Sequence, residues 1–123
     1  TLMSIIVWID PMPKPRMTRS DAWKKRPCVL AYWAWKKELL LKLGRKTFFQ
    51  DGLLHVKFFI SIPTSWSIKK QQAMRGQPHQ QKPDLDNLVK ALQDALCVSD
   101  AHIYEIHAKK LWADQGSIEF FKG

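Results

Sequence analysis

Acidic residues and one lysine in the middle of the chain have the types and spacing of a hydrolytic site. Asp84 and Asp86 lie two residues apart, Lys90 follows four residues after the second, and Asp100 comes after an apolar, helix-like run. Cleavage of a phosphodiester requires charge neutralisation and an activated water, and Mg²⁺ bound to carboxylate oxygens supplies both. Two or three carboxylates on an otherwise basic surface could form such a site. An adjacent lysine could stabilise the developing charge or orient the water.

The same spacing also has a purely structural interpretation. Aspartate is a favoured N-cap, and acids in a first turn suit the positive end of the helix dipole, each effect contributing about 1 kcal/mol. Asp86 and Lys90 at i and i+4 form an ordinary helix ion pair, worth a few tenths of a kcal/mol. A D-x-D pair alone is common by chance, so the spacing by itself favours capping.

The charge of the chain indicates a polyanionic partner. Twenty Lys and Arg residues against eleven Asp and Glu residues give a formal net charge of +9, which favours nucleic acid. A membrane surface is the rival, but no basic amphipathic helix with a clean apolar face stands out. A basic protein without such a partner is a further alternative. The candidate DNA-binding residues lie in two basic loops, 14–26 and 69–82, and are Lys14, Arg16, Arg19, Lys69, Lys70, Arg75 and Lys82.

Hydrophobic periodicity predicts one α+β domain over residues 1–123, with a small mixed β-sheet and helices packed on one face. The long helices are expected from Pro27 to a C-cap at Gly44 and over residues 85–97, where leucines form an i, i+3, i+4, i+7 stripe. Ser67 could cap a short helix that ends near Gly76. Strands are expected over 2–9, 53–62, 101–113 and 117–121, in the order β-α-β-(α)-α-β-β.

The central motif resembles a known family. KPDLDNLVKALQDAL (82–96), followed by VSDAHI (98–103), is similar to the signature of the RusA family of Holliday-junction resolvases. Upstream, PMPKPRMTR (11–19) and PTSWSIKK (63–70) resemble the phage-borne branch. The resemblance implies an α+β fold and a homodimer that cuts two strands of a four-way DNA junction symmetrically in recombination and repair. It also implies a bacterial or phage-encoded protein.

The site follows from the resemblance residue by residue. The family's metal-binding, catalytic acids correspond to Asp84, Asp86 and Asp100, with Mg²⁺ as the expected cofactor and Mn²⁺ as an alternative metal. The lysine that the family needs for cleavage corresponds to Lys90. Where the family usually carries two acids in the turn, this chain has Ser99 before Asp100. That difference puts the role of the first turn acid in doubt but retains the second.

Other polar and aromatic residues receive weaker predictions. His55 and His107 are expected in the core or on the surface of strands, whereas His79 and His102 could contact the metal or a phosphate. Asp94 is interpreted as a partner that positions Lys90. Trp23 and Trp66 lie in basic loops and could stack on bases, but most of the six tryptophans should serve packing.

The compartment follows from what the chain lacks. Cys28 and Cys97 stand alone without C-x-x-C spacing, which suggests a reducing compartment and argues against the familiar zinc patterns. No apolar run approaches the ~20 residues that span a bilayer, and the opening residues lack the charged region of a signal peptide. We therefore expect a cytoplasmic protein without membrane association.

We predict a Mg²⁺-dependent, structure-selective endodeoxyribonuclease that resolves Holliday junctions. The alternatives are a non-catalytic basic DNA-binding protein and a less selective nuclease that cuts flaps or RNA. A straight helix over residues 86–97 would separate its ends by roughly 18 Å, too far for Asp84, Asp86 and Asp100 of one chain to share an ion. Two antiparallel helices across a two-fold axis would solve this. We therefore also expect active sites built from both chains of the homodimer.

Overall fold

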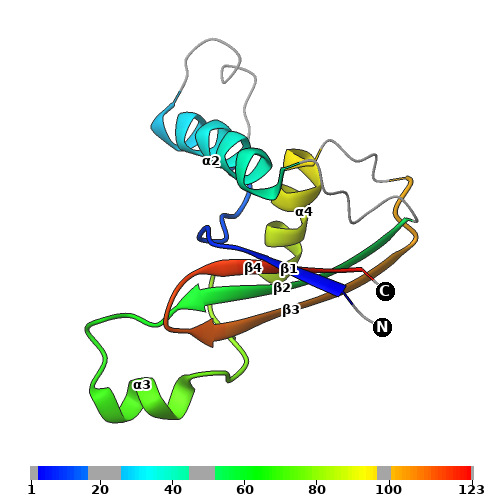
Figure 1. The fold of residues 1–123 in the computed structure, drawn as a ribbon. Helices are drawn as coiled ribbons and strands as arrows, with labels where there is room; N and C mark the ends of the chain where they lie inside the picture. The colour runs from blue at the N-terminus through cyan, green and yellow to red at the C-terminus, as the bar shows by residue number, and fades with distance from the viewer. Residues whose placement is uncertain (1–2, 17–25, 45–51, 97–100, 123) are drawn as a thin grey trace.

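The computed structural model describes residues 3–16, 26–44, 52–96 and 101–122 (Figure 1). Arg19, Trp23, Cys97, Ser99 and Asp100 therefore lie outside the described residues. The helices and strands are β1 (Met3–Val7), α2 (Pro27–Leu43), β2 (Leu53–Ser61), α3 (Ile68–Met74), α4 (Leu85–Ala95), β3 (Glu105–Ala113) and β4 (Ser117–Lys122). Their order confirms the predicted β-α-β-(α)-α-β-β arrangement.

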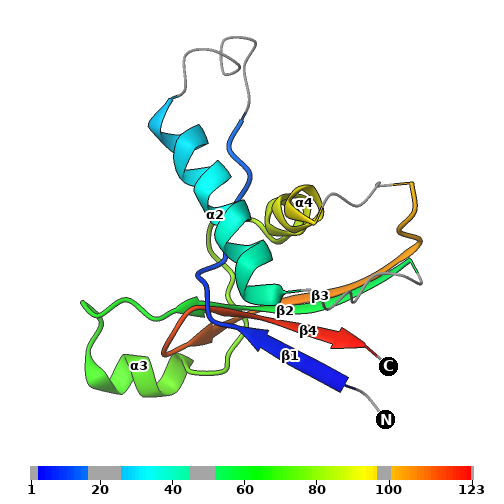
Figure 2. The same cartoon turned by 45° about the horizontal axis from the view of Figure 1, so that its top comes forward.

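The strands form one open, mixed sheet in the order β1-β4-β2-β3. β2 runs parallel to β3 with Leu53 opposite Glu105, and β4 runs antiparallel to both β1 and β2. Figure 2 shows α2 and α4 over the same face of this sheet, whereas α3 projects from its end. The predicted α+β class, with helices on one face of a mixed sheet, is confirmed. None of the described helices is long and apolar enough to cross a membrane.

The core lies between the sheet and the two long helices. Alternate residues of β2 turn inward because side chains on a strand point to opposite faces, and the leucine stripe of α4 meets them. The fully buried members include Tyr32 and Leu39 of α2, Leu54, Val56 and Phe58 of β2, Leu88 and Leu92 of α4, and Ile118 and Phe120 of β4.

Local signals predicted most of the helix ends. Gly44 follows α2 with a φ of 70°, and its N–H donates to the carbonyl of Leu40. The Ser67 hydroxyl caps α3 by accepting a hydrogen bond of 3.2 Å from the backbone N–H of Lys70. Both predicted caps are confirmed.

Three predicted elements extend two or more residues beyond the observed ones. α4 ends at Ala95 rather than at residue 97, because the backbone departs from helical ψ at Leu96, whose φ is −85° and ψ is −1°. β1 ends at Val7, where the N–H of Ile9 turns back to the Val7 carbonyl. β3 begins at Glu105 rather than at residue 101, because the N–H of Tyr104 just before it donates to the carbonyl of Gly52.

Candidate active site

The two aspartates of the D-x-D motif lie at the start of α4, Asp84 as its N-cap and Asp86 in its first turn. Asp84 is the N-cap residue, with an extended backbone (φ −68°, ψ 142°), and its carbonyl accepts a hydrogen bond from the N–H of Leu88. Its carboxylate makes no capping hydrogen bond to the described start of the helix. Asp84 and Asp86 are both exposed. The carboxylates therefore lie in solvent near the positive end of the helix dipole, where they are available to a cation.

Lys90 lies one turn after Asp86 on the same face of α4. Its ammonium nitrogen is 4.0 Å from the Asp86 carboxylate, and both side chains are largely exposed. An exposed i, i+4 pair of this length contributes little to stability, so Lys90 remains available to a ligand. Both residues border a shallow groove of about 430 Å³ between α4 and β3, which is otherwise lined by Leu85, Val89, Gln93, Ile106 and Ala108.

The segment that enters α4 is held along the edge of β3. The N–H of Gly76 donates to the carbonyl of Trp112, and the N–H of His79 donates to the carbonyl of Lys110. The Lys110 ammonium also donates to the carbonyls of Gln81 and Pro83, at 2.5 and 2.7 Å. Lys110 was not predicted from the sequence. The sequence feature that could have indicated it is a lysine at a position of β3 that shares a face with Ala108 and Trp112.

The proline-rich loop after β1 is fixed beside α4. The Asn87 side chain donates a hydrogen bond of 3.1 Å to the carbonyl of Lys14, and the Arg26 guanidinium donates to the carbonyl of Arg16. The Trp35 indole of α2 donates to the carbonyl of Asp10. These bonds bring the backbone that carries the predicted DNA-binding residues Lys14 and Arg16 next to the helix that carries the acids.

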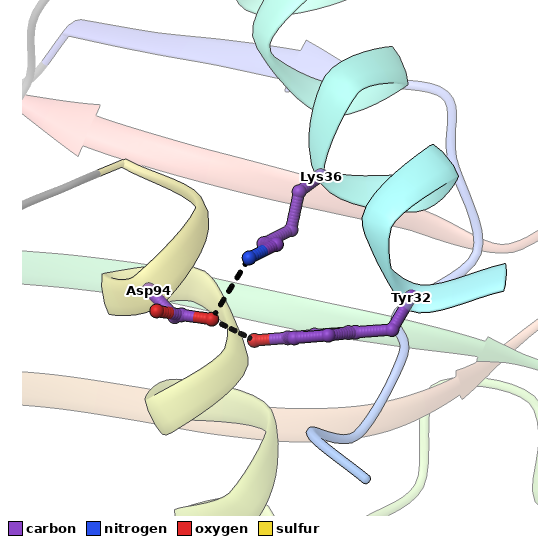
Figure 3. Close-up of polar contacts among 3 residues, drawn as sticks. All are labelled: Tyr32, Lys36 and Asp94. Atoms are coloured by element: carbon purple, nitrogen blue, oxygen red, sulfur yellow. Dashed lines mark hydrogen bonds and ion pairs between the residues drawn. The ribbon is translucent and has the colours of Figure 1, made fainter. Parts of the chain in front are cut away.

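Asp94 links α4 to α2 rather than to Lys90. Its carboxylate accepts a hydrogen bond of 2.7 Å from the Tyr32 hydroxyl and one of 3.1 Å from the Lys36 ammonium (Figure 3). The interpretation of Asp94 as the partner of Lys90 is therefore wrong. Burial opposes ionisation of Asp94, but the hydrogen bonds from Tyr32 and Lys36 and the charges of Lys36 and Lys14 outweigh it and lower its pKa. Burial, followed by the bond to Asp94, raises the pKa of Tyr32.

The basic residues of α3 form a second group, away from α2 and α4 (Figure 2). Lys69, Lys70 and Arg75 are all exposed. The Lys70 ammonium lies 4.1 Å from the centre of the Trp66 ring, and Arg75 forms an ion pair of 2.8 Å with Asp114. The predicted DNA-binding residues are thus divided between the Lys14 loop and the α3 region, and exposed Lys82 lies in the segment between α3 and α4.

Trp66 and His79 are used in packing. The Trp66 ring lies 4.8 Å from that of Trp112, and the His79 ring lies 4.3 Å from it on centroids. His79 is only 3% exposed, and its Nδ1 has no hydrogen-bond partner among the described residues. Burial and the nearby charge of Lys110 lower the pKa of His79. A neutral, buried ring is a poor phosphate contact, which argues against that predicted role.

The remaining histidines lie on two strands of the sheet or just before one of them. His55 of β2 and His107 of β3 are direct cross-strand neighbours, with ring centroids 5.4 Å apart. Their side chains are on the sheet face opposite the buried Leu54 and Val56. His102 is exposed before β3. Both histidines are on strands, as predicted.

The donor chemistry of the D-x-D pair fits a hard divalent cation. Mg²⁺ binds through one or two carboxylates and keeps several waters, and Asp84 and Asp86 offer two exposed carboxylates at one helix start. Within the described ranges, no group of three or more His, Cys, Asp or Glu side chains could hold a metal ion. The third predicted ligand, Asp100, lies outside those ranges.

Comparison with known proteins identifies one family. Residues 9–120 match the sequence model of the family described as "Endodeoxyribonuclease RusA". The match covers nearly all of the 123 residues and includes the Lys14 loop, α3, α4 and the strands after them. None of the curated proteins compared with this chain matches it.

Proposed function

Because the chain belongs to the RusA family of endodeoxyribonucleases, we propose that it resolves Holliday junctions by symmetric, Mg²⁺-dependent strand cleavage. The family implies an enzyme that acts on branched DNA. The observation that carries the specific proposal is the start of α4, where the exposed Asp84 carboxylate occupies a capping position without capping the helix. Asp84 and Asp86 thus have the availability that a metal ligand needs.

We assign metal binding to Asp84, Asp86 and Asp100, and assistance in cleavage to Lys90. Mg²⁺ held there would neutralise charge on the scissile phosphate and lower the pKa of a bound water. Lys90 lies beside Asp86 and would place a positive charge where negative charge develops on the phosphate. Lys14, Arg16 and Arg19 of one loop, and Lys69, Lys70, Arg75 and Lys82 around α3, would hold the DNA backbone.

We further propose that the enzyme is a homodimer with active sites shared between chains. α4 has 11 residues, so its ends are about 16 Å apart at ~1.5 Å per residue. His102, two residues after Asp100, packs on Gly52: a Cβ built at Gly52 would lie 2.8 Å from the His102 carbonyl oxygen. This contact lies at the start of β2 and β3, next to the Leu53–Glu105 pair.

The segment that carries the D-x-D motif is held further along β3. The Pro83 carbonyl accepts a hydrogen bond from Lys110. Lys110 lies five residues after Glu105, which places it about 17 Å further along the strand at ~3.3 Å per residue. Figure 1 likewise places the orange segment after residue 100 beyond the C-terminal end of α4. His102, two residues after Asp100, and the start of α4 are thus far apart in one chain, which supports a site completed by a second chain.

The decisive experiment is cleavage of a synthetic four-way junction. With Mg²⁺, the protein should cut two opposite strands, whereas EDTA should abolish cleavage and a linear duplex should remain intact. Asp84→Asn and Asp86→Asn should each fold, bind the junction and lose most cleavage, because Asn retains size but not charge. Glu38→Gln, which changes an exposed acid of α2, is the matched control.

The outcomes separate the alternatives. Equal cutting of flaps, RNA and junctions would identify a less selective nuclease. Junction binding without cleavage under any metal condition would identify a non-catalytic DNA-binding protein. Normal cleavage by both Asp→Asn variants would exclude a catalytic role for the D-x-D pair.

A further inference from the structure

Lys110 occupies a position in β3 where an apolar side chain would be expected. Its neighbours in the same register, Ala108 and Trp112, turn toward the helix-covered face, and Trp112 is only 4% exposed. Placing an ammonium group on such a face is unfavourable unless it is hydrogen-bonded. Lys109, the next residue, points to the opposite face and is exposed. The two adjacent lysines therefore have different environments.

The hydrogen bonds of Lys110 converge on the segment that leads into the D-x-D motif. Its ammonium donates to the carbonyl of Gln81 at 2.5 Å and to the carbonyl of Pro83 at 2.7 Å. Its own carbonyl accepts a hydrogen bond of 2.9 Å from the N–H of His79. One residue of β3 thus binds the entering segment at three points over five residues, through both its main chain and its side chain.

The bond to Pro83 acts directly on the geometry of Asp84. The Pro83 carbonyl and the Asp84 N–H belong to one planar peptide group. Holding that oxygen restrains the plane, which contains the Asp84 N and Cα atoms; together with the φ of −68° at Asp84, the plane sets the direction in which the Cα–Cβ bond leaves the backbone. Asp84 sits at an extended N-cap position whose side chain does not cap the described helix start. The local helix therefore does little to orient this carboxylate, and an external support is needed.

We propose that Lys110 is a positioning residue for Asp84: it holds the 81–83 segment so that the Asp84 carboxylate faces the metal. This inference rests on the proposed function. Partners that orient metal ligands from outside the ligand set typically affect metal affinity or activity by ~10- to 100-fold. Lys110 acts through the backbone, so we expect a loss of roughly tenfold, at the lower end of that range.

The test compares Lys110→Met with Lys109→Met. Methionine retains an unbranched apolar stem and removes the donors, and both substitutions lower the net charge of the same strand by one. The half-saturating Mg²⁺ concentration for junction cleavage should rise roughly tenfold in Lys110→Met and stay near the native value in Lys109→Met. In the metal-free proteins, amide exchange over residues 79–88 should be faster only in Lys110→Met. Mn²⁺ binding, followed by the paramagnetic resonance of free Mn²⁺, gives a readout that is independent of cleavage.

Two further measurements distinguish a positioning role from a DNA contact and from a simple loss of charge. Junction affinity in EDTA should be equal in the two methionine variants, because a positioning lysine does not contact phosphate. Lys110→Arg retains charged donors and should recover part of the metal affinity. If Lys110→Met does not fold, Lys110→Gln, which keeps a shorter donor, replaces it in the same comparison.

The inference is overturned if Lys110→Met and Lys109→Met have the same metal dependence. It is also overturned if Lys110→Met loses junction affinity while its metal dependence stays native, because Lys110 would then be a DNA contact. These results differ from failure of the proposed function, in which the native protein itself would neither bind the metal at the D-x-D pair nor cut the junction.

Discussion

The Asn87 side chain donates a hydrogen bond of 3.1 Å to the carbonyl oxygen of Lys14, a residue 73 positions earlier in the chain. Asn87 follows the D-x-D pair in the first turn of α4, and Lys14 lies in the proline-rich loop after β1. The bond joins the basic loop to the acidic helix start. A phosphate held by the loop would therefore lie close to the candidate metal ligands.

Replacing Asn87 by Ala should release this loop. A net hydrogen bond contributes about 1 kcal/mol, and we expect junction affinity in EDTA to fall about fivefold because the loop must be ordered on binding. Fluorescence anisotropy with a labelled junction measures the change. Gln115→Ala, which removes an exposed amide between β3 and β4 rather than beside Asp86 and Lys90, is the control. Equal affinities of the two variants would show that the loop does not depend on Asn87.

Mixed dimers test whether the active sites are shared. A heterodimer of an Asp84→Asn chain and an Asp100→Asn chain carries both substitutions in one composite site and none in the other. We expect it to nick one strand of the junction, although each variant alone is inactive. If every site lies within a single chain, both sites of the heterodimer are damaged and the mixture remains inactive.

Two basic residues of the α3 group, Lys69 and Arg75, should contribute unequally to the salt dependence of binding. The plot of log affinity against log salt has a negative slope, and each phosphate contact that is lost makes this slope less steep by about 0.9 on duplex DNA. Arg75 is already paired with Asp114 at 2.8 Å, whereas Lys69 is exposed on α3. We therefore expect Lys69→Met to flatten the slope more than Arg75→Met does. A larger effect at Arg75 would mean that DNA displaces Asp114 from it.

The Tyr32–Asp94 hydrogen bond should stabilise the packing of α2 on α4. A hydrogen bond to a charged group is worth about 1.5 to 3 kcal/mol, and partial exposure of Asp94 favours the lower end. The pKa of Asp94 is lowered in the folded protein. The stabilisation from ionised Asp94 is therefore complete above the pKa of Asp94 in the unfolded chain, about 3.9, and is lost as the pH falls through its pKa in the folded protein. Urea unfolding of Tyr32→Phe should show a loss at pH 7 that shrinks near pH 3.

The exposed Tyr104 supplies the control for this measurement. Tyr104→Phe should unfold like the native protein at both pH values. A Tyr32→Phe loss that does not depend on pH would show that the ionisation of Asp94 is not coupled to the Tyr32 bond.

Buried His79 should make the fold less stable in mild acid. Its pKa is lowered in the folded protein, so the unfolded chain binds the proton first as the pH falls below about 6.5. The free energy of unfolding therefore decreases as the pH falls from about 6.5 toward the pKa of His79 in the folded protein. His79→Phe keeps a ring against Trp112, and between pH 7.5 and 5.5 it should lose less stability than the native protein. The pKa of His55 is also lowered, by burial and by His107, so His55 accounts for a separate part of the loss of stability in mild acid. A His79→Phe protein with the full native decrease would contradict the prediction.

The sequence alone was sufficient for the fold class, for the positions of the helices and strands and for the family. Leucines at helical spacing in α4, alternation in β2 and the caps at Gly44 and Ser67 are local signals, because each depends on residues within a few positions of one another. The D-x-D-N motif is also contiguous, and the family match over residues 9–120 confirms the resemblance drawn from it. Where α4 ends was predicted less well, since no proline or glycine marks Leu96 as its cap.

Only the tertiary structure decided how the candidate site is supported. Asp94 and Lys90 have the spacing of an ion pair, but the pairing of Asp94 with Tyr32, 62 residues away, prevails because packing α2 on α4 places that hydroxyl 2.7 Å from the carboxylate. Lys110 reaches Pro83 across 27 residues for the same reason. Such contacts have no periodicity and no fixed spacing in the chain, so they exist only once the sheet and its helices have brought the partners together.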